Sequence, residues 1–134
     1  MTAFVDTSAF LAVLHRSDQN HARAATVWRA LLEDDEELVC TNYVLLETLA
    51  LLQSRFGLDA VRDLLENVVP LLHVVWVNDD VHGAGVSALL TANRRLLSLV
   101  DCVSFVVMRR LSISRAFAFD KHFVEQGFEP ARGR

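Results

Sequence analysis

Four carboxylates each stand as the only charge inside a strongly apolar stretch of this chain: Asp6, Glu47, Asp101 and Asp120. The four stretches read AFVDTSAFLA, NYVLLETLALLQS, LLSLVDCVSFVVM and AFAFD. Asp and Glu are rarely buried without a partner, because a carboxylate that leaves water loses its hydration. A fold that buries these stretches must therefore supply the acids with protons or with cations.

Short apolar runs alternate with longer helical patterns along the chain. The runs predict strands at residues 3–5, 38–40, 72–77 and 113–119, and Phe128 is expected to start an edge strand. Helices are expected at residues 7–15, 20–34, 42–56, 58–69, 78–94, 97–111 and 121–126. The expected caps are Thr7 or Ser8 for the first of them, Thr41 or Asn42 for the third, and Asn78-Asp79 for the fifth. Strands separated by one or two helices are typical of a parallel sheet covered on both faces. We therefore predict a three-layer α/β/α fold with four to five parallel strands.

This architecture would bring the four acids toward one place. Asp6 and Asp120 follow predicted strands, and ligands of parallel sheets sit at the carboxyl ends of the strands. Asp101 lies near the start of a helix, with the Ser104 hydroxyl one turn later on the same face. Glu47 lies in a helix that is apolar nearly all round, so we expect it to be buried on most sides.

Each acid taken alone also has a structural interpretation. Glu47 would form a buried ion pair with an arginine, Asp101 would stabilise a helix start, and Asp120 would cap a short helix. Four clustered carboxylates, however, would raise one another's pKa unless a cation neutralised them. The cluster therefore predicts a hard divalent metal bound by oxygen ligands, an arrangement that many nucleases use on phosphate substrates.

The charge balance points to the same side chains. The chain has 17 acids and 13 Lys and Arg, so removing the four acids leaves 13 of each sign. The net charge of -4 therefore equals that of the predicted site, and two divalent ions would cancel it. Basic residues gather late in the chain, and most are arginines, which suit bidentate contacts with phosphate.

Length and composition predict one domain over residues 1–134, with a tail that frays from about residue 130. The apolar fraction of 52% favours a homodimer or a hydrophobic protein partner. We expect no membrane span and a cytoplasmic location. Cys40 and Cys102 are expected to be reduced core thiols. The histidines form no metal-binding spacing and are expected at the surface or its boundary: His15, His21, His73, His82 and His122.

The order of these motifs resembles that of the PIN-domain ribonucleases, and most of all the VapC-type toxins of bacterial toxin-antitoxin pairs. The resemblance lies in a strand followed by Asp-Thr-Ser, an apolar helix with Glu47, the run VDCVSFVVMRR, and AFAFDKHF followed by Gly-Phe. It covers essentially the whole chain, and none of the four acids is missing.

The resemblance implies a PIN-like fold and a metal-dependent endoribonuclease that hydrolyses RNA phosphodiester bonds with a metal-activated water. It implies Mg²⁺ or Mn²⁺ as cofactor, an RNA substrate, a homodimer and a small cognate antitoxin that blocks the site. We expect Asp6, Asp101 and Asp120 to hold metal, and Glu47 to bind a second ion or orient the water; one ion or two is left open. The implied catalytic acids and supporting hydroxyls are Asp6, Glu47, Asp101 and Asp120, with Thr7 and Ser104.

Other functions fit these residues less well. A receiver domain needs adjacent acids after its first strand, and a haloacid-dehalogenase-type phosphatase needs a second Asp at position 8, which is Ser. The alternatives that stay open are a PIN-domain housekeeping nuclease outside any toxin pair and a non-catalytic PIN fold that binds RNA or protein. Four costly carboxylates argue against the non-catalytic alternative.

Overall fold

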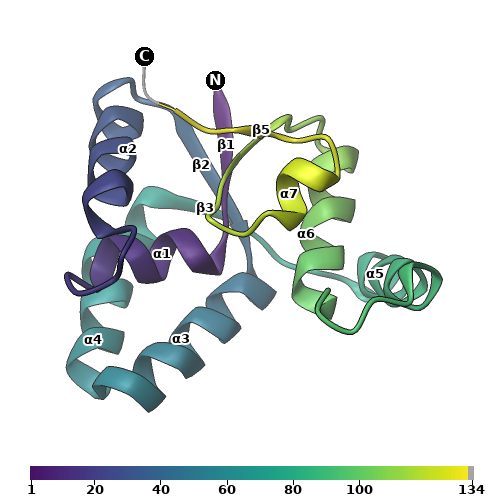
Figure 1. Ribbon diagram of the computed structural model, residues 1–134, viewed down its shortest axis with the longest axis horizontal. Coiled ribbons are helices and arrows are strands. Elements are labelled where there is room, and N and C mark those ends of the chain that lie inside the picture. The colour runs from purple at the N-terminus through teal and green to yellow at the C-terminus, as the bar shows by residue number, and fades with distance from the viewer. Residues whose placement is uncertain (133–134) are drawn as a thin grey trace.

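Five parallel strands form the centre of the computed structural model, which describes residues 1–132 (Figure 1). The strand order is β3-β2-β1-β4-β5, so β1 occupies the middle of the sheet. Ala3, Phe4 and Val5 of β1 are fully buried, as expected for a strand covered on both faces. The strands are β1 (Thr2–Val5), β2 (Glu37–Thr41), β3 (Leu72–Val75), β4 (Arg115–Phe117) and β5 (Glu129–Pro130).

Helices cover both faces of this sheet, which confirms the predicted three-layer arrangement. In Figure 1, α1, α2 and α4 lie to the left of the strands, and α5, α6 and α7 lie to the right. The helices are α1 (Thr7–Leu14), α2 (His21–Glu33), α3 (Asn42–Phe56), α4 (Leu58–Asp63), α5 (Asp79–Ala92), α6 (Leu99–Arg110) and α7 (His122–Glu125). Gly85 lets α5 approach α6 closely, since a Cβ there would lie 2.5 Å from a methyl group of Val103.

Several helices begin with a side-chain cap directly after a strand or its extension. The Thr41 hydroxyl accepts a hydrogen bond from the Val44 amide at 3.1 Å, and the Asn78 side chain accepts one from Val81 at 2.9 Å. Thr41 and Asn78 are each one of the two residues expected at these caps. The first helix was expected to be capped by Thr7 or Ser8, but its cap is Asp6, the acid that follows β1. A carboxylate at this point satisfies free amides of the helix and lies at the edge of the sheet where parallel strands end.

Three predicted elements are shorter in the structure. The helix expected at residues 58–69 ends at Asp63 and continues as a π-helical segment, Leu64–Val68, and a 3₁₀ turn, Val69–Leu71. Pro70 lies in that turn and has no amide hydrogen to continue an α-helix. The strands expected at residues 72–77 and 113–119 have only the cores Leu72–Val75 and Arg115–Phe117.

The end of the described chain is more ordered than the sequence indicated. We expected fraying from about residue 130, but Glu129–Pro130 form β5, and the Ala131 amide donates to the Ala116 carbonyl at 2.8 Å. Ala131 is also buried. The predicted fraying of residues 133–134 lies outside the described residues, and the assignment of the whole chain to one domain stays a prediction. Within residues 1–132, no helix is long and apolar enough to cross a membrane.

Both cysteines behave as the sequence predicted. Cys40 on β2 and Cys102 on α6 are free thiols buried in the core. Burial raises the pKa of the Cys40 thiol to about 12, so this side chain stays neutral and unreactive. Neither cysteine needs to be considered as a metal ligand or a nucleophile.

Candidate metal centre

Asp6 lies between the central strand and the first helix, and it is almost completely buried. Its side chain is positioned by Ser8, because its Oδ2 accepts hydrogen bonds from the Ser8 hydroxyl at 2.7 Å and from the Ser8 amide at 3.2 Å. Burial is the largest cause that raises the pKa of Asp6 to about 6, and the nearby charge of Asp101 contributes. A carboxylate held in this way has a strong tendency to take up a proton or a cation.

Asp101 lies in the first turn of α6 and is 7% exposed. It forms a capping box with Ser98: the Ser98 hydroxyl accepts from the Asp101 amide, and Asp101 Oδ2 accepts from the Ser98 amide at 3.2 Å. Burial raises the pKa of the Asp101 carboxyl, and the negative charge of Asp120 raises it further. The helix-start role considered from the sequence is thus real, and it also places the carboxylate toward Asp120.

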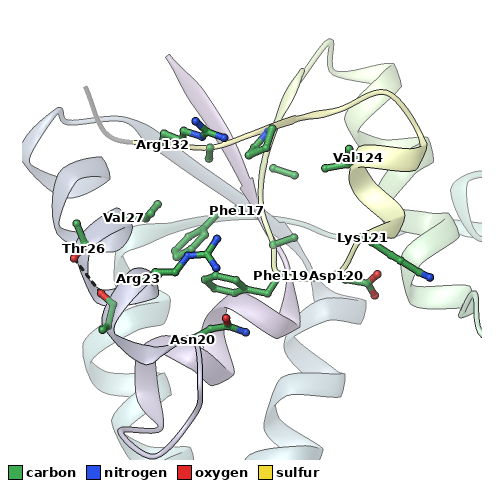
Figure 2. Close-up of a pocket in the computed structure, with 15 residues that line it drawn as sticks. Asn20, Arg23, Thr26, Val27, Phe117, Phe119, Asp120, Lys121, Val124 and Arg132 are labelled. Carbon is green, nitrogen blue, oxygen red and sulfur yellow. Dashed lines mark hydrogen bonds between the residues drawn. The ribbon is translucent and has the colours of Figure 1, made fainter.

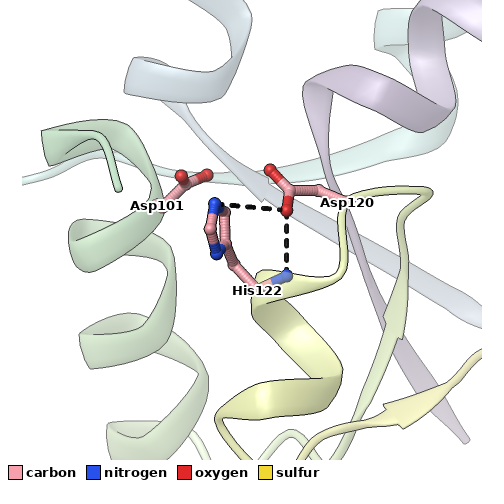
Figure 3. Close-up of side chains that lie close together, drawn as sticks. All are labelled: Asp101, Asp120 and His122. Carbon is pink, nitrogen blue, oxygen red and sulfur yellow. Dashed lines mark hydrogen bonds and ion pairs between the residues drawn. The ribbon is translucent and has the colours of Figure 1, made fainter. Parts of the chain in front are cut away.

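Asp120 and His122 complete a compact group with Asp101 (Figure 3). Donor atoms of these three side chains all lie within 4.8 Å of one another. Asp120 Oδ1 accepts a hydrogen bond from the His122 amide at 2.9 Å and lies 3.6 Å from His122 Nε2. Lys121, not Asp120 as considered from the sequence, occupies the N-cap position of α7, but the Asp120 carboxylate still accepts from the first amide of that helix.

The prediction that His122 lies at the surface or its boundary is wrong. His122 is 7% exposed, and its imidazole packs at the start of α7 with Nε2 facing Asp120 (Figure 3). Its Nδ1 is buried without a hydrogen bond, although Glu125 lies 3.7 Å away. The sequence carried one local signal for this placement: His122 stands two residues after Asp120, so the turn that positions one side chain also positions the other.

This donor set fits a divalent cation. Oxygen ligands suit Mg²⁺ and Mn²⁺, and imidazole adds preference for transition metals over Mg²⁺. The raised pKa of Asp101, which has Asp120 as one cause, indicates carboxylates close enough to repel one another without a cation between them. Asp6 is not a member of the group of Asp101, Asp120 and His122, whose donor atoms lie within 4.8 Å of one another. Its charge interaction with Asp101 places it beside that group.

Glu47 differs from the other three acids. It lies on α3 and is half-buried, so the expectation that it is buried on most sides is wrong. The reason is that α3 buries only a narrow stripe, Val44, Thr48 and Leu52. Glu47 lines a groove whose other walls include Leu46, Leu99 and Val100, and it is not part of the metal-type group found among residues 1–132.

The hydroxyls that contact the acids are not the two expected from the family resemblance. The Thr7 hydroxyl faces the Val44 carbonyl at 3.4 Å, and the Ser104 hydroxyl donates to the Val100 carbonyl at 2.8 Å. Supporting roles for Thr7 and Ser104 therefore stay predictions. Ser8, which was expected only as a possible helix cap, contacts Asp6 and also accepts a hydrogen bond from the Phe119 amide at 3.0 Å. It links Asp6 to the segment that carries Asp120.

Comparison with known proteins places this geometry in context. A model of the PIN domain matches residues 3–129. The 23S rRNA-specific endonuclease VapC20 of Mycobacterium tuberculosis, from strains CDC 1551 / Oshkosh and ATCC 25618 / H37Rv, is 34% identical over 130 residues, which are 96% of this chain and 97% of the relative. The crystal structure of M. tuberculosis VapC20, described as a sarcin-ricin loop cleaving toxin, has a TM-score of 0.84 and 31% identity over 98% of this chain and 99% of that chain.

Proposed function

We propose that this chain, which belongs to the PIN-domain family, is a metal-dependent endoribonuclease and the toxin of a toxin-antitoxin pair. The family membership and the similarity to the VapC20 endonuclease support the reaction class. The observation that carries the proposal is the juxtaposition of Asp101, Asp120 and His122 beside a buried Asp6. Helix-start contacts of Asp6 and Asp101 could also be made by a neutral side chain such as Asn, without the cost of burying several negative charges side by side.

The proposed roles follow from the positions of the side chains. Asp101 and Asp120 would hold the cation together with Asp6, and His122 would add an imidazole nitrogen to the donors. A bound Mg²⁺ or Mn²⁺ would lower the pKa of a water molecule and neutralise charge on the phosphodiester. Ser8 and Ser98 keep two carboxylates in fixed orientations, so little reorganisation is needed when substrate arrives. Glu47 is proposed to orient the attacking water or to bind a second ion.

The substrate is proposed to be a looped or single-stranded RNA segment. The relative with 34% identity is named for its action on 23S rRNA, so this RNA is the first substrate to test. A small antitoxin protein, a homodimer and a cytoplasmic location complete the proposal. The apolar side chains that α3 leaves exposed, such as Leu46, supply surface for a protein partner.

The test uses purified protein, bacterial ribosomes and mapping of RNA ends. We expect cleavage of 23S rRNA at one or few sites in Mg²⁺ or Mn²⁺, and none in EDTA. Asp120→Asn keeps the shape of the side chain and should abolish cleavage, whereas Asp59→Asn, a change of an exposed acid on α4, should leave it intact. Equal cleavage in EDTA, or by the Asp120→Asn variant, would refute the metal-dependent reaction.

A further inference from the structure

A groove of about 710 Å³ runs beside the metal centre, between α2 and the β4–α7 segment (Figure 2). This volume is in the range of ligand-binding sites. The Arg23 side chain on α2 reaches across toward Phe119, and Lys121 and Arg132 border the other wall. The groove adjoins the proposed reaction site because Asp120 lines the groove and also belongs to the group with Asp101.

The charges of the groove favour an anionic occupant. Its three cations, Arg23, Lys121 and Arg132, form no ion pair with a carboxylate among residues 1–132, and Asp120 is the one acid in its lining. Some arginines elsewhere are paired within the fold, as Arg94 is with Glu125 at 3.0 Å. Lys121 also interacts with the charge of Glu125, but none of the three cations is held in a salt bridge among residues 1–132, so they are available to an anionic or aromatic ligand.

The groove also contains a stacking surface. The Arg23 guanidinium lies 5.6 Å from the centre of the Phe119 ring, which is half-buried and packs edge-on against Phe117. Unpaired RNA bases stack on aromatic rings and on arginine planes. The Phe119 amide donates to the Ser8 hydroxyl, which donates to Asp6, so one serine fixes this surface relative to a proposed metal ligand.

We propose that this groove binds the unpaired RNA segment next to the scissile phosphate, with a base against the Arg23–Phe119 pair and phosphates at Lys121 and Arg132. The inference rests on the proposed nuclease function, since it names a binding site for that substrate. An RNA occupant is favoured over a protein segment because cations and an aromatic face adjoin the site where a phosphodiester must lie.

Binding can be measured without cleavage. Fluorescence anisotropy would follow a labelled oligouridylate of about twelve nucleotides in EDTA, which blocks the proposed reaction. Arg23→Glu should raise Kd about tenfold, and Arg132→Ala, which removes a proposed phosphate contact, should reduce the slope of log K against log salt concentration by about 0.7. Phe119→Leu keeps apolar packing but removes the aromatic face, and it should raise Kd about fivefold.

Arg29→Glu is the matched control, because Arg29 is an exposed residue of the same helix and does not line the groove. It should change Kd less than about twofold, and thermal melting would confirm that all variants are folded. Equal weakening by Arg23→Glu and Arg29→Glu would reveal only a general charge effect and would overturn the inference. Unchanged binding in Arg23→Glu would overturn it too, and would assign the groove to another occupant such as a protein segment.

The outcomes separate the groove from the reaction. If Arg23→Glu weakens RNA binding but the native protein cleaves no RNA, the groove inference stands and the proposed nuclease function fails. If the protein cleaves RNA in Mg²⁺ and Arg23→Glu binds and cleaves as well as the native chain, the nuclease function stands and the groove inference fails.

Discussion

Helix α6 buries seven of its 12 residues, including Asp101, whereas α3 buries three of its 15 and leaves Leu46 68% exposed. The two helices look alike in sequence, because each contains a single acid within an apolar run. Helix α6 is packed between the sheet and α5, so its acid is held inside the protein. Helix α3 covers the sheet with one stripe only, so its acid and several apolar side chains stay accessible.

The difference shows that an apolar helix with one acid can either belong to the core or lie partly at the surface. In α6 the run is core, and its acid is a candidate ligand that the fold itself desolvates. In α3 the run exceeds what the core can take up, and the excess suits a surface that another molecule covers. The next experiments test this division between an internal site and an accessible one, from the largest expected effect to the smallest.

Replacing the internal acid should abolish activity. Asp101→Asn keeps a side-chain oxygen that can accept from the Ser98 amide, but it removes the charge that would hold the cation. We expect the rate of RNA cleavage in Mg²⁺ to fall at least about a hundredfold, with an unchanged circular dichroism spectrum. Single-turnover cleavage measures the rate, and Asp59→Asn again serves as the exposed-acid control. Retained activity would remove Asp101 from the site.

The buried Asp6 should make the metal-free protein less stable as pH rises. Its folded pKa of about 6 is above the ordinary value of 3.8, so its favourable contribution is complete below about pH 4 and is lost as pH rises through 6. The loss is about 3 kcal/mol in the free energy of unfolding. Asp6→Asn should remove the part of this pH dependence that Asp6 causes, while the part from Asp101, whose pKa is also raised, remains. The variant should still fold, because Asn also caps helices.

Urea unfolding in EDTA at pH 4 and pH 8 measures this effect for both proteins. In a separate measurement at pH 8 without EDTA, Mn²⁺ should stabilise the native chain more than Asp6→Asn, because the cation replaces the proton on the carboxylate. If the stability of the native protein falls no more between pH 4 and pH 8 than that of Asp6→Asn, then Asp6 is not desolvated in the folded state.

A matched pair of alanine substitutions compares the two helices directly. Val107→Ala on α6 removes methyl groups from the core, where the side chain is 3% exposed, and should lower the free energy of unfolding by about 2 kcal/mol. Leu46→Ala on α3 should change it by less than about 0.5 kcal/mol in dilute protein. Chemical denaturation measures both.

Leu46→Ala should instead weaken association with a partner. Sedimentation velocity over a range of protein concentrations would detect a smaller fraction of dimer than in the native chain. Equal destabilisation by the two substitutions would contradict the division between core and interface.

Glu47→Gln should have the smallest effect on metal binding and on cleavage. Because Glu47 lies outside the group of donors, we expect Mn²⁺ to raise the melting temperature of this variant as much as that of the native chain. Cleavage should fall about tenfold, the size expected when a carboxylate orients water rather than holding the metal. Loss of the Mn²⁺ effect would instead make Glu47 a ligand of the main ion.

The sequence predicted the architecture, because the hydrophobic period is a local signal. Of the four acids that it selected, three lie near the site, and acids at strand ends are a local signal too. It did not reveal that Glu47 is half-buried, since a helix that is apolar all round does not indicate what covers it. His122 was missed because its burial comes from the turn after Asp120, which brings it against α6. Ser8 was missed because its second contact, with Phe119, joins residues more than a hundred positions apart.

The central position of β1 has a consequence for the time at which the protein becomes active. Strand β4 pairs with β1, and the segment after β4 carries Asp120 and His122. Asp6, at the start of the chain, therefore meets these two residues only after nearly the whole chain has been synthesised. A chain still emerging from the ribosome, or one released before Arg115, has Asp6 and Asp101 at most and no assembled centre. For an enzyme proposed to cut ribosomal RNA, this order of assembly delays activity until translation of its own message is almost complete.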